Sequence, residues 1–327
     1  MLKMYSRQDH AGNEPEFWDN AWDQVAPANF ENIRNICEND PLWPLFERTV
    51  VPDRLLMDGG CGPGQWVKYY HDRGCRTLGV DFAPRAIERL KRLDPSLNVR
   101  QADICDLPLK DGELRVYYSG GVVEHFEEGP QDALKEARRV IATDGYFLCS
   151  IPEASWLRDQ LLYRSANVER MVVRGDFGVR RIPDPRREST PQGWNFYQYA
   201  FEEGEFRNHL EEAGFRIEET FGLSVLWGLY EIPGVKQAVP LVQRAISSAA
   251  AIAQGWKPRA SAGTNRTATD IASDNSSSDI SQSGGVLGEL ARRILVREDV
   301  TVPVLGSLLQ LARDRVANLR MYVARPN

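Results

Sequence analysis

The sequence predicts an α/β fold, a Rossmann-like, doubly wound parallel sheet with helices on both faces. A short apolar run ends in a glycine-rich turn at residues 55–64, LLMDGGCGPG, and a helix-compatible stretch follows directly. Apolar segments then alternate with amphipathic segments as far as residue 151. Candidate ligand side chains stand where successive predicted strands end, and open α/β sheets bind their ligands at those ends.

Length and composition restrict the classes of function. With 327 residues, 42% of them hydrophobic, the chain can bury one large core with insertions. A net charge of −6 argues against nonspecific nucleic-acid binding. The five cysteines form no C-x-x-C pair, which favours reduced thiols in a cytoplasmic protein. The N-terminal residues include no apolar core of the kind found in signal peptides, and no apolar run is long enough to span a membrane. The four histidines lie too far apart in the sequence to predict a metal site.

The glycine-rich turn is the centre of the prediction. Asp58 ends the apolar run, and Gly60, Gly62 and Gly64 follow at alternate positions. Glycines allow positive φ and remove every Cβ, so a ligand can lie on the main chain beside the next helix N-terminus. Gln65 stands where a dinucleotide fingerprint requires its third glycine, and no G-K-[ST] follows for a P-loop. The spacing therefore excludes both nucleotide motifs.

Two acids end the next predicted strands. Asp81 lies about 20 residues beyond the turn, where an acid can accept both ribose hydroxyls of an adenosine. A helix N-cap is the alternative role for Asp81, because Pro84 follows at a first helical position. Asp103 and Ile104 end the third predicted strand, and an acid beside a β-branched side chain can contact the amine and ring faces of adenine.

These segments together resemble the class I S-adenosylmethionine (SAM) methyltransferases. DGGCGPG resembles their motif I, D/E-x-G-x-G-x-G, and ADICDLP resembles the run that ends their third strand. RVYYSGGVVEHF resembles their fourth strand and its E-H sequence, although Arg115 replaces a common acid. The resemblance covers about residues 50–151, 199–223 and 317–325 and is closest to the small-molecule branch that includes ubiquinone and menaquinone methyltransferases.

The resemblance implies a fold, a cofactor and a site. It implies a seven-stranded sheet in the order 3-2-1-4-5-7-6 with strand 7 antiparallel, and SAM as the methyl donor. The implied cofactor-binding residues are Asp58, Gly59, Gly60, Cys61, Gly62, Gly64, Asp81, Phe82, Asp103, Ile104, Ser119 and Gly120. An N-terminal helix often closes over the cofactor in such enzymes, which would place Tyr5 and Trp18 at the pocket.

The expected reaction is in-line attack of an acceptor oxygen, nitrogen or carbon on the sulfonium methyl. His125 is a candidate general base, with Glu124 and Tyr197 as further candidates. Alternatively, His125 only orients neighbouring groups or starts a helix. A different class of function also stays open, namely a regulatory or complex-forming protein that binds SAM without methylating.

The remaining chain divides around this core. The expected parts are a helical cap at 1–50, the core at 51–154, an acceptor-recognition insertion at 155–198, a helix and strand 6 at 199–224, an insertion at 225–316 with disorder near 260–285, and strand 7 at 317–327. Glu202 and Glu203 suit the start of the late core helix. The acceptor is expected to be a small molecule that is apolar or carries an acidic group, the latter facing Arg174, Arg180, Arg181, Arg186 or Arg187; a solvated charged loop is the alternative reading of these arginines.

Overall fold

The computed structural model describes most of the chain. The described residues are 1–7, 9–24, 30–156, 159–160, 172–174, 177–182, 189–202, 204–223, 315 and 317–327. The expected disorder near 260–285 and nearly all of the expected insertion at 225–316 lie outside them.

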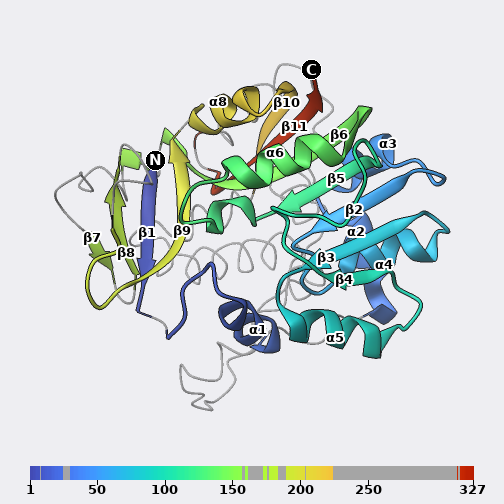
Figure 1. The fold of residues 1–327 in the computed structure, drawn as a ribbon, viewed down its shortest axis with the longest axis horizontal. Helices are drawn as coiled ribbons and strands as arrows, with labels where there is room; N and C mark the ends of the chain where they lie inside the picture. Colours follow the sequence, from blue (N-terminus) through green and yellow to red (C-terminus); the bar gives the residue numbers. More distant parts are fainter. Residues whose placement is uncertain are drawn as a thin grey trace, which may run out of the picture.

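A seven-stranded core, part of an 11-stranded sheet of the described residues, forms the centre of the fold (Figure 1). In spatial order its strands are β4 (Val99–Gln101), β3 (Thr77–Asp81), β2 (Leu55–Gly59), β5 (Leu114–Gly120), β6 (Ile141–Ala154), β11 (Leu319–Pro326) and β10 (Phe215–Leu223). Strands β4 to β6 pair in parallel, and β11 runs antiparallel to both β6 and β10. The predicted order 3-2-1-4-5-7-6 with an antiparallel strand 7 is confirmed.

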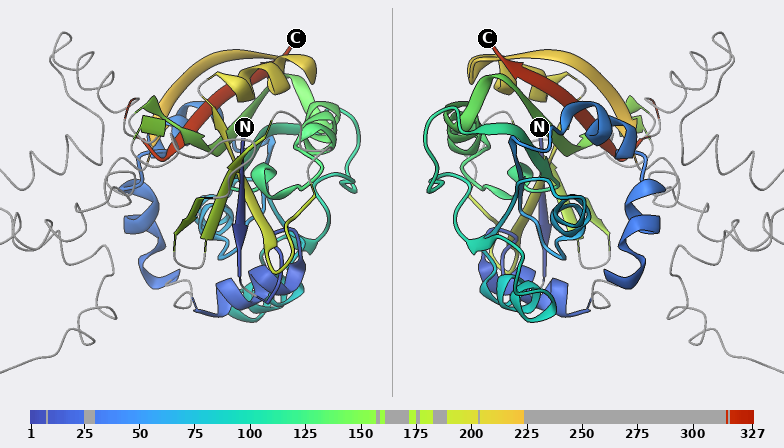
Figure 2. Two further views of the ribbon diagram at one scale, coloured as in Figure 1. Left: turned by 90° about the vertical axis from the view of Figure 1, so that its left-hand side faces the viewer. Right: turned by 90° about the vertical axis from the view of Figure 1, so that its right-hand side faces the viewer.

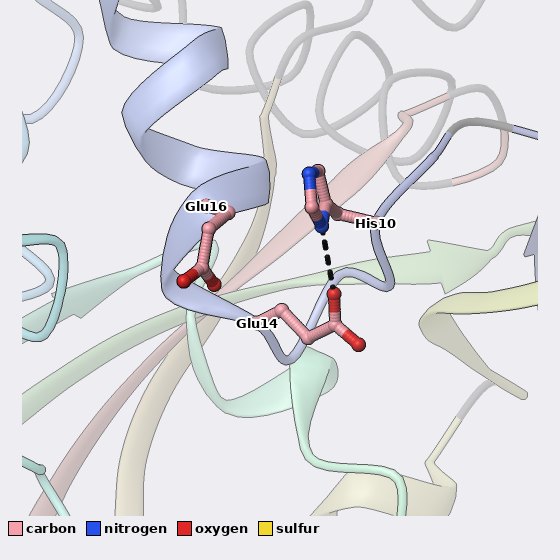
Figure 3. Close-up of side chains that lie close together, drawn as sticks. All are labelled: His10, Glu14 and Glu16. Carbon is pink, nitrogen blue, oxygen red and sulfur yellow. Dashed lines mark hydrogen bonds and ion pairs between the residues drawn. The ribbon is translucent and has the colours of Figure 1, made fainter.

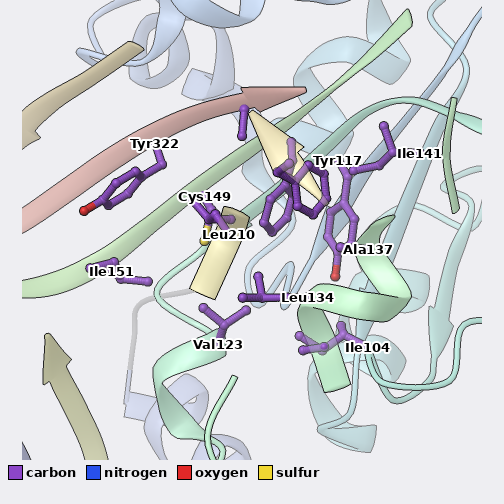
Figure 4. Close-up of a cluster of buried hydrophobic side chains, with 14 of the residues drawn as sticks. Ile104, Tyr117, Val123, Leu134, Ala137, Ile141, Cys149, Ile151, Leu210 and Tyr322 are labelled. Carbon is purple, nitrogen blue, oxygen red and sulfur yellow. The ribbon is translucent and has the colours of Figure 1, made fainter. Parts of the chain in front are cut away.

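Helices cover both faces of this sheet because apolar side chains alternate between them along each strand. One core includes Met57, Tyr117 and Phe147 and packs on α6 (Gln131–Val140) and α8 (Glu205–Glu212). Figure 4 labels Tyr117 with Leu134 of α6 and Leu210 of α8. The other core includes Leu56 and Leu148, which are the sequence neighbours of Met57 and Phe147 and point to the opposite face. This core packs on α2 (Ile33–Glu38), α3 (Trp43–Thr49) and α4 (Gln65–Asp72). Helix α5 (Pro84–Leu93) contacts β3 and β4 at the edge of the sheet.

A second set of strands leaves the core at the end of β6. Strand β1 (Leu2–Ser6) lies antiparallel between β8 (Phe177–Arg181) and β9 (Asn195–Glu202), with β7 (Val172–Arg174) beyond β8 (Figure 2). Strand β9 joins the last two residues of β6 in parallel. The carboxyl ends of the core strands therefore point toward these added strands (Figure 1).

Two boundary predictions need correction. The expected helical cap at 1–50 begins with a strand, Leu2–Ser6, and its helices start only with α1 (Pro15–Gln24). The late core helix α8 begins at Glu205, because Glu202 is the last residue of β9. In both cases residues that were expected in a helical part of the chain pair instead with strands far away in the sequence.

A buried ionic group fixes the point where β6 meets both β9 and β11. The guanidinium of Arg320 donates to Glu153 Oε1 at 2.8 and 3.0 Å, and the hydroxyl of Tyr322 donates to Glu153 Oε2 at 3.3 Å. Arg320 and Glu153 are both buried. All five cysteines are free thiols, and among the described residues no helix has the length and apolar character that crossing a membrane requires.

Candidate active site

The glycine-rich turn adopts the conformation that its composition predicts. Gly60, Gly62 and Gly64 have φ angles of 78°, 44° and 72°, a region that favours glycine. The N–H of Gly60 donates to Val80 O at 2.7 Å, which ties the turn to β3. A Cβ on Gly60 would lie 2.3 Å from Val122. The turn therefore packs closely against Val122 and tolerates no side chain at its centre.

Asp81 connects this turn to the end of β3. Its Oδ2 accepts the N–H of Gly62 at 2.8 Å, and its Oδ1 accepts the N–H of Ala83 at 2.9 Å. The N-cap position of α5 is Ala83, so Asp81 is not the cap residue. Burial raises the pKa of Asp81, and the charge of Asp19 acts in the same direction. Each carboxylate oxygen has a second lone pair, so Asp81 keeps capacity for further donors.

The side chains of Asp58 and Cys61 and the position of Gly59 are all enclosed by the protein. Asp58 is buried, and burial followed by the charge of Asp81 raises its pKa to about 8. A Cβ on Gly59 would lie 2.6 Å from the Tyr117 ring. The Cys61 side chain packs into an apolar cluster with α5, so only its backbone is available to a ligand.

The strand ends beside β3 are held by short local bonds. Asp103 Oδ1 accepts the N–H of Cys105 at 2.8 Å, and the Ile104 side chain is buried in the main core. The carbonyl of Phe82 accepts a hydrogen bond from Gln101 Nε2 at 3.2 Å. The first bond orders the chain after β4 and the second joins the ends of β4 and β3, while contact of these residues with adenine stays a prediction.

The end of β5 holds two buried polar atoms that need a partner. Ser119 Oγ and Glu124 Oε2 are inaccessible to solvent and have no hydrogen-bond partner among the residues that the structure describes. A Cβ on Gly120 would meet the Tyr118 hydroxyl at 2.1 Å. Burial raises the pKa of Glu124 to about 8, so its carboxyl is mostly protonated at neutral pH. Unsatisfied buried polar atoms are costly, which favours a bound ligand at this strand end.

His125 is held in one orientation. It lies in the short 3-10 helix η2 (Val123–His125), and its Nδ1 is 2.8 Å from the carbonyl oxygen of Tyr197. Because a carbonyl can only accept, Nδ1 carries the proton, and in the neutral ring Nε2 has the free lone pair. Burial lowers the pKa of His125 to about 4. Nε2 lies 4.0 Å from Glu124 Oε1. Tyr197 thus contributes its backbone rather than its hydroxyl to this contact.

Helix α1 places aromatic rings over these strand ends. The Trp18 ring meets His125 edge-on at 4.7 Å between centroids, and Phe17 lies 5.7 Å from Tyr197. Trp22 follows one turn later, 5.6 Å from Trp18. The Trp18 contact agrees with the role that the resemblance implies. Trp22 was not among the predicted site residues, although the i, i+4 spacing of the two tryptophans is visible in the sequence.

Three residues of metal-ligating type gather at the N-terminal end of α1, two before the helix and one in its first turn. One ligand atom each from His10, Glu14 and Glu16 can lie within 4.8 Å of the other two (Figure 3). His10 Nδ1 is already 3.1 Å from Glu14 Oε2, and both side chains are exposed. This group was not predicted from the spacing of the histidines, and an exposed His–Glu pair is common without a metal.

The predicted acceptor-facing arginines are placed only in part. Arg181 pairs with both Asp159 and Glu202. Arg174 lies in β7 and Arg180 in β8, and residues 186 and 187 lie outside the described part of the chain. Arg181 is therefore already neutralised within the protein.

Known proteins share the core that carries this site. Residues 57–149 match the family model of the methyltransferase domain, Methyltransf_11. A probable S-adenosylmethionine-dependent methyltransferase of Mycolicibacterium smegmatis is 26% identical over 243 residues, which are 71% of this chain and 82% of that protein. The protein is an S-adenosylmethionine-dependent methyltransferase.

Two further proteins are similar to this methyltransferase. A malonyl-[acyl-carrier protein] O-methyltransferase of Enterobacter lignolyticus is 29% identical over 90 residues, which are 28% of this chain and 36% of that enzyme. A solved S-adenosylmethionine-dependent methyltransferase structure from Mesorhizobium loti has 17% identity and a TM-score of 0.41, and covers 62% of this chain and 94% of that chain.

SAM is the cofactor of this methyltransferase, and the site fits it. The positive-φ cradle leaves no room for side chains at Gly60 and Gly62, and Asp81 offers a buried carboxylate beside it. Ser119 and Glu124 add polar atoms without a partner in the described structure. When bound, SAM supplies a methyl group activated by a positive sulfonium.

Proposed function

We propose that this methyltransferase transfers the methyl group to a hydroxyl of a small, neutral, ring-bearing acceptor, with His125 Nε2 accepting the hydroxyl proton. The observation that carries the proposal is the hydrogen bond from His125 Nδ1 to the Tyr197 carbonyl, because it leaves Nε2 as the acceptor. With a pKa of about 4, the ring is neutral and able to accept a proton throughout the neutral pH range.

Glu124 supports this role through its proximity. An imidazolium formed at His125 would be buried, and buried cations need a counter-charge. Glu124 Oε1 lies 4.0 Å from Nε2, and its pKa of about 8 would fall beside an imidazolium, so that its proton passes to solvent and the carboxylate supplies the counter-charge. We therefore treat the two side chains as one coupled acid–base pair.

The charges around the site favour a neutral acceptor over an acidic one. Asp19 and Asp81 bring carboxyl groups to the strand ends, which suits the positive sulfonium, whereas the protonated carboxyl of Glu124 adds no charge there. The buried ammonium of Lys3 is paired with Glu127 at 2.7 Å. Arg181 is paired as well.

The rings of Trp18, Phe17 and Tyr197 support an apolar, planar acceptor. They lie at or near His125 from two different elements. Aromatic surfaces favour stacking or edge contacts with a ring substrate. A phenol or quinol combines such a ring with a hydroxyl, in keeping with the resemblance to quinone-pathway methyltransferases. Oxygen as the methylated atom also agrees with the name of the Enterobacter relative, which is an O-methyltransferase. The free cysteines support a cytoplasmic location as part of the same proposal.

In the test, the full chain is incubated with methyl-deuterated SAM and, in separate reactions, with sets of phenols, quinols, carboxylic thioesters and amines. We expect mass gain on phenols or quinols, together with release of S-adenosylhomocysteine. His125→Gln should lower kcat about 10²- to 10⁴-fold while S-adenosylhomocysteine still binds. The matched control is His71→Gln, since His71 is a surface histidine bonded to Ser96 and should leave kcat unchanged.

Three outcomes would contradict the proposal. Methylation confined to amines would exclude oxygen transfer, and a kcat of His125→Gln within twofold of the parent would exclude the base. Binding of S-adenosylhomocysteine without methylation of any acceptor set would favour the regulatory or complex-forming alternative.

A further inference from the structure

Hydrogen bonds and an ion pair connect helix α1 to the first turns of α5. Asp19 Oδ1 accepts the N–H of Arg85 at 3.0 Å, and Asp19 Oδ2 lies 3.3 Å from Arg85 Nε. Three residues later on α1, the carbonyl of Trp22 accepts a hydrogen bond from Arg89 Nη1 at 2.7 Å. Side chains on this face of α1 therefore have a fixed position relative to the glycine-rich turn, which lies beside α5.

The side chain that reaches the turn is Trp22. A Cβ on Gly62 would lie 2.7 Å from Trp22 Cζ2 and 2.9 Å from Cε2. Cε2 is bonded to the indole nitrogen, so the N–H group of the ring is at the glycine cradle. Gly62 can have no side chain here, and the indole takes the space that such a side chain would need.

The indole N–H of Trp22 has no hydrogen-bond acceptor among the described residues. Trp22 Nε1 is inaccessible to solvent and makes no hydrogen bond to any residue that the structure describes. Buried indole N–H groups normally find an acceptor. By contrast, Trp18 Nε1 donates to Gly12 O at 2.8 Å and Trp43 Nε1 donates to Tyr69 at 2.9 Å.

We propose that Trp22 is a cofactor-binding residue, and that its indole N–H donates a hydrogen bond to a polar atom of bound SAM. The cofactor is expected to lie along the glycine-rich turn beside the indole, and the N–H of Gly62 is already donated to Asp81. Trp22 supplies a donor at the same place from a different part of the chain. This inference depends on SAM as the cofactor and is independent of the proposed acceptor.

The same helix also reaches the other half of the site. Trp18, one turn before Trp22, contacts His125. One face of α1 therefore touches both the cofactor cradle and the proposed base.

The test is fluorine NMR of the full chain labelled with 5-fluorotryptophan and titrated with S-adenosylhomocysteine. Trp22→Phe and Trp43→Phe assign the two signals by their disappearance. We expect the Trp22 signal to shift with saturation of the site, and the Trp43 signal to stay in place, because its indole is bonded to Tyr69 away from the cradle.

Calorimetry on the two variants gives the second measurement. Loss of one neutral hydrogen bond should weaken S-adenosylhomocysteine binding by Trp22→Phe about three- to tenfold. Trp43→Phe also removes an indole N–H but should bind as the parent does. A Trp22 signal that stays fixed at saturation would overturn the proposal even if Trp22→Phe folds poorly. An unchanged Kd in a folded Trp22→Phe would overturn it as well.

Discussion

Replacing Asp81 with asparagine tests the cofactor site at its most connected residue. The carboxylate accepts two backbone N–H groups, from Gly62 and Ala83, and is predicted to accept both ribose hydroxyls. Asparagine keeps the shape but is neutral and has only one acceptor oxygen. Hydrogen bonds to a charged group contribute about 1 kcal/mol more than neutral ones. Two such bonds amount to about 2 kcal/mol, so the Kd for S-adenosylhomocysteine should rise about 30-fold.

The assay is isothermal titration of parent and variant with S-adenosylhomocysteine, together with urea unfolding. One backbone N–H also loses its acceptor, so Asp81→Asn should lower the free energy of unfolding by about 1–3 kcal/mol. Asp94→Asn is the matched control, because Asp94 likewise accepts the N–H two residues on, from Ser96, but lies away from the cradle. The control should bind like the parent. If Asp81→Asn also binds with the parent's Kd, the ribose assignment is wrong.

Three further predictions concern the turn, the buried ion pair and pH. Gly62→Ala should lower the free energy of unfolding by about 1–2 kcal/mol because of its positive φ, and should also weaken S-adenosylhomocysteine binding because its Cβ would lie 2.7 Å from an indole ring. Gly74→Ala is the control, since Gly74 also has a positive φ but its Cβ would meet open space. Equal losses of binding in calorimetry would exclude the clash as the cause. Arg320→Met leaves the Glu153 carboxylate buried without its guanidinium and should cost about 3–5 kcal/mol in urea unfolding, whereas a loss below about 1 kcal/mol would show that the pair is dispensable. His125 has a folded pKa of about 4, below its usual 6.5, so its contribution is complete above pH 6.5 and is lost as pH falls toward 4; the free energy of unfolding of the parent, relative to His125→Gln, should drop about 2 kcal/mol from pH 7 to pH 5, and a constant difference would refute the burial effect.

The central sheet could be predicted because its signals are local. The glycine-rich turn, Asp81 and Asp103 each follow a short apolar run, and their spacing along the chain sets which strand ends meet. The antiparallel strand at the C-terminus was predicted too, but from the resemblance rather than from its own residues. Parallel strands place their carboxyl ends at one edge, so order in the sequence becomes proximity in space.

Strand β1 could not be predicted because nothing near it in the sequence pairs with it. Leu2–Ser6 is five residues long, and its partners are β8 and β9, which begin at Phe177 and Asn195. A short apolar run of this kind does not distinguish a strand from the start of a helix. The same pairing explains why Glu202 ends a strand instead of starting α8.

The sequence indicates which residue types stand at the candidate site, but not the contacts that they make. His125 and Tyr197 are in contact, but through the Tyr197 carbonyl, which no side-chain pattern encodes. Cys61 belongs to the motif yet directs its side chain into the core. Trp22 could not be assigned from the sequence, because its contact with Gly62 depends on how α1 packs beside α5.

The most direct test of the account is calorimetry of the full chain with S-adenosylhomocysteine and with NADH under the same conditions. The glycine spacing and the bonds of Asp81 predict binding of one S-adenosylhomocysteine per chain and no binding of NADH. Binding of NADH without S-adenosylhomocysteine would contradict the account.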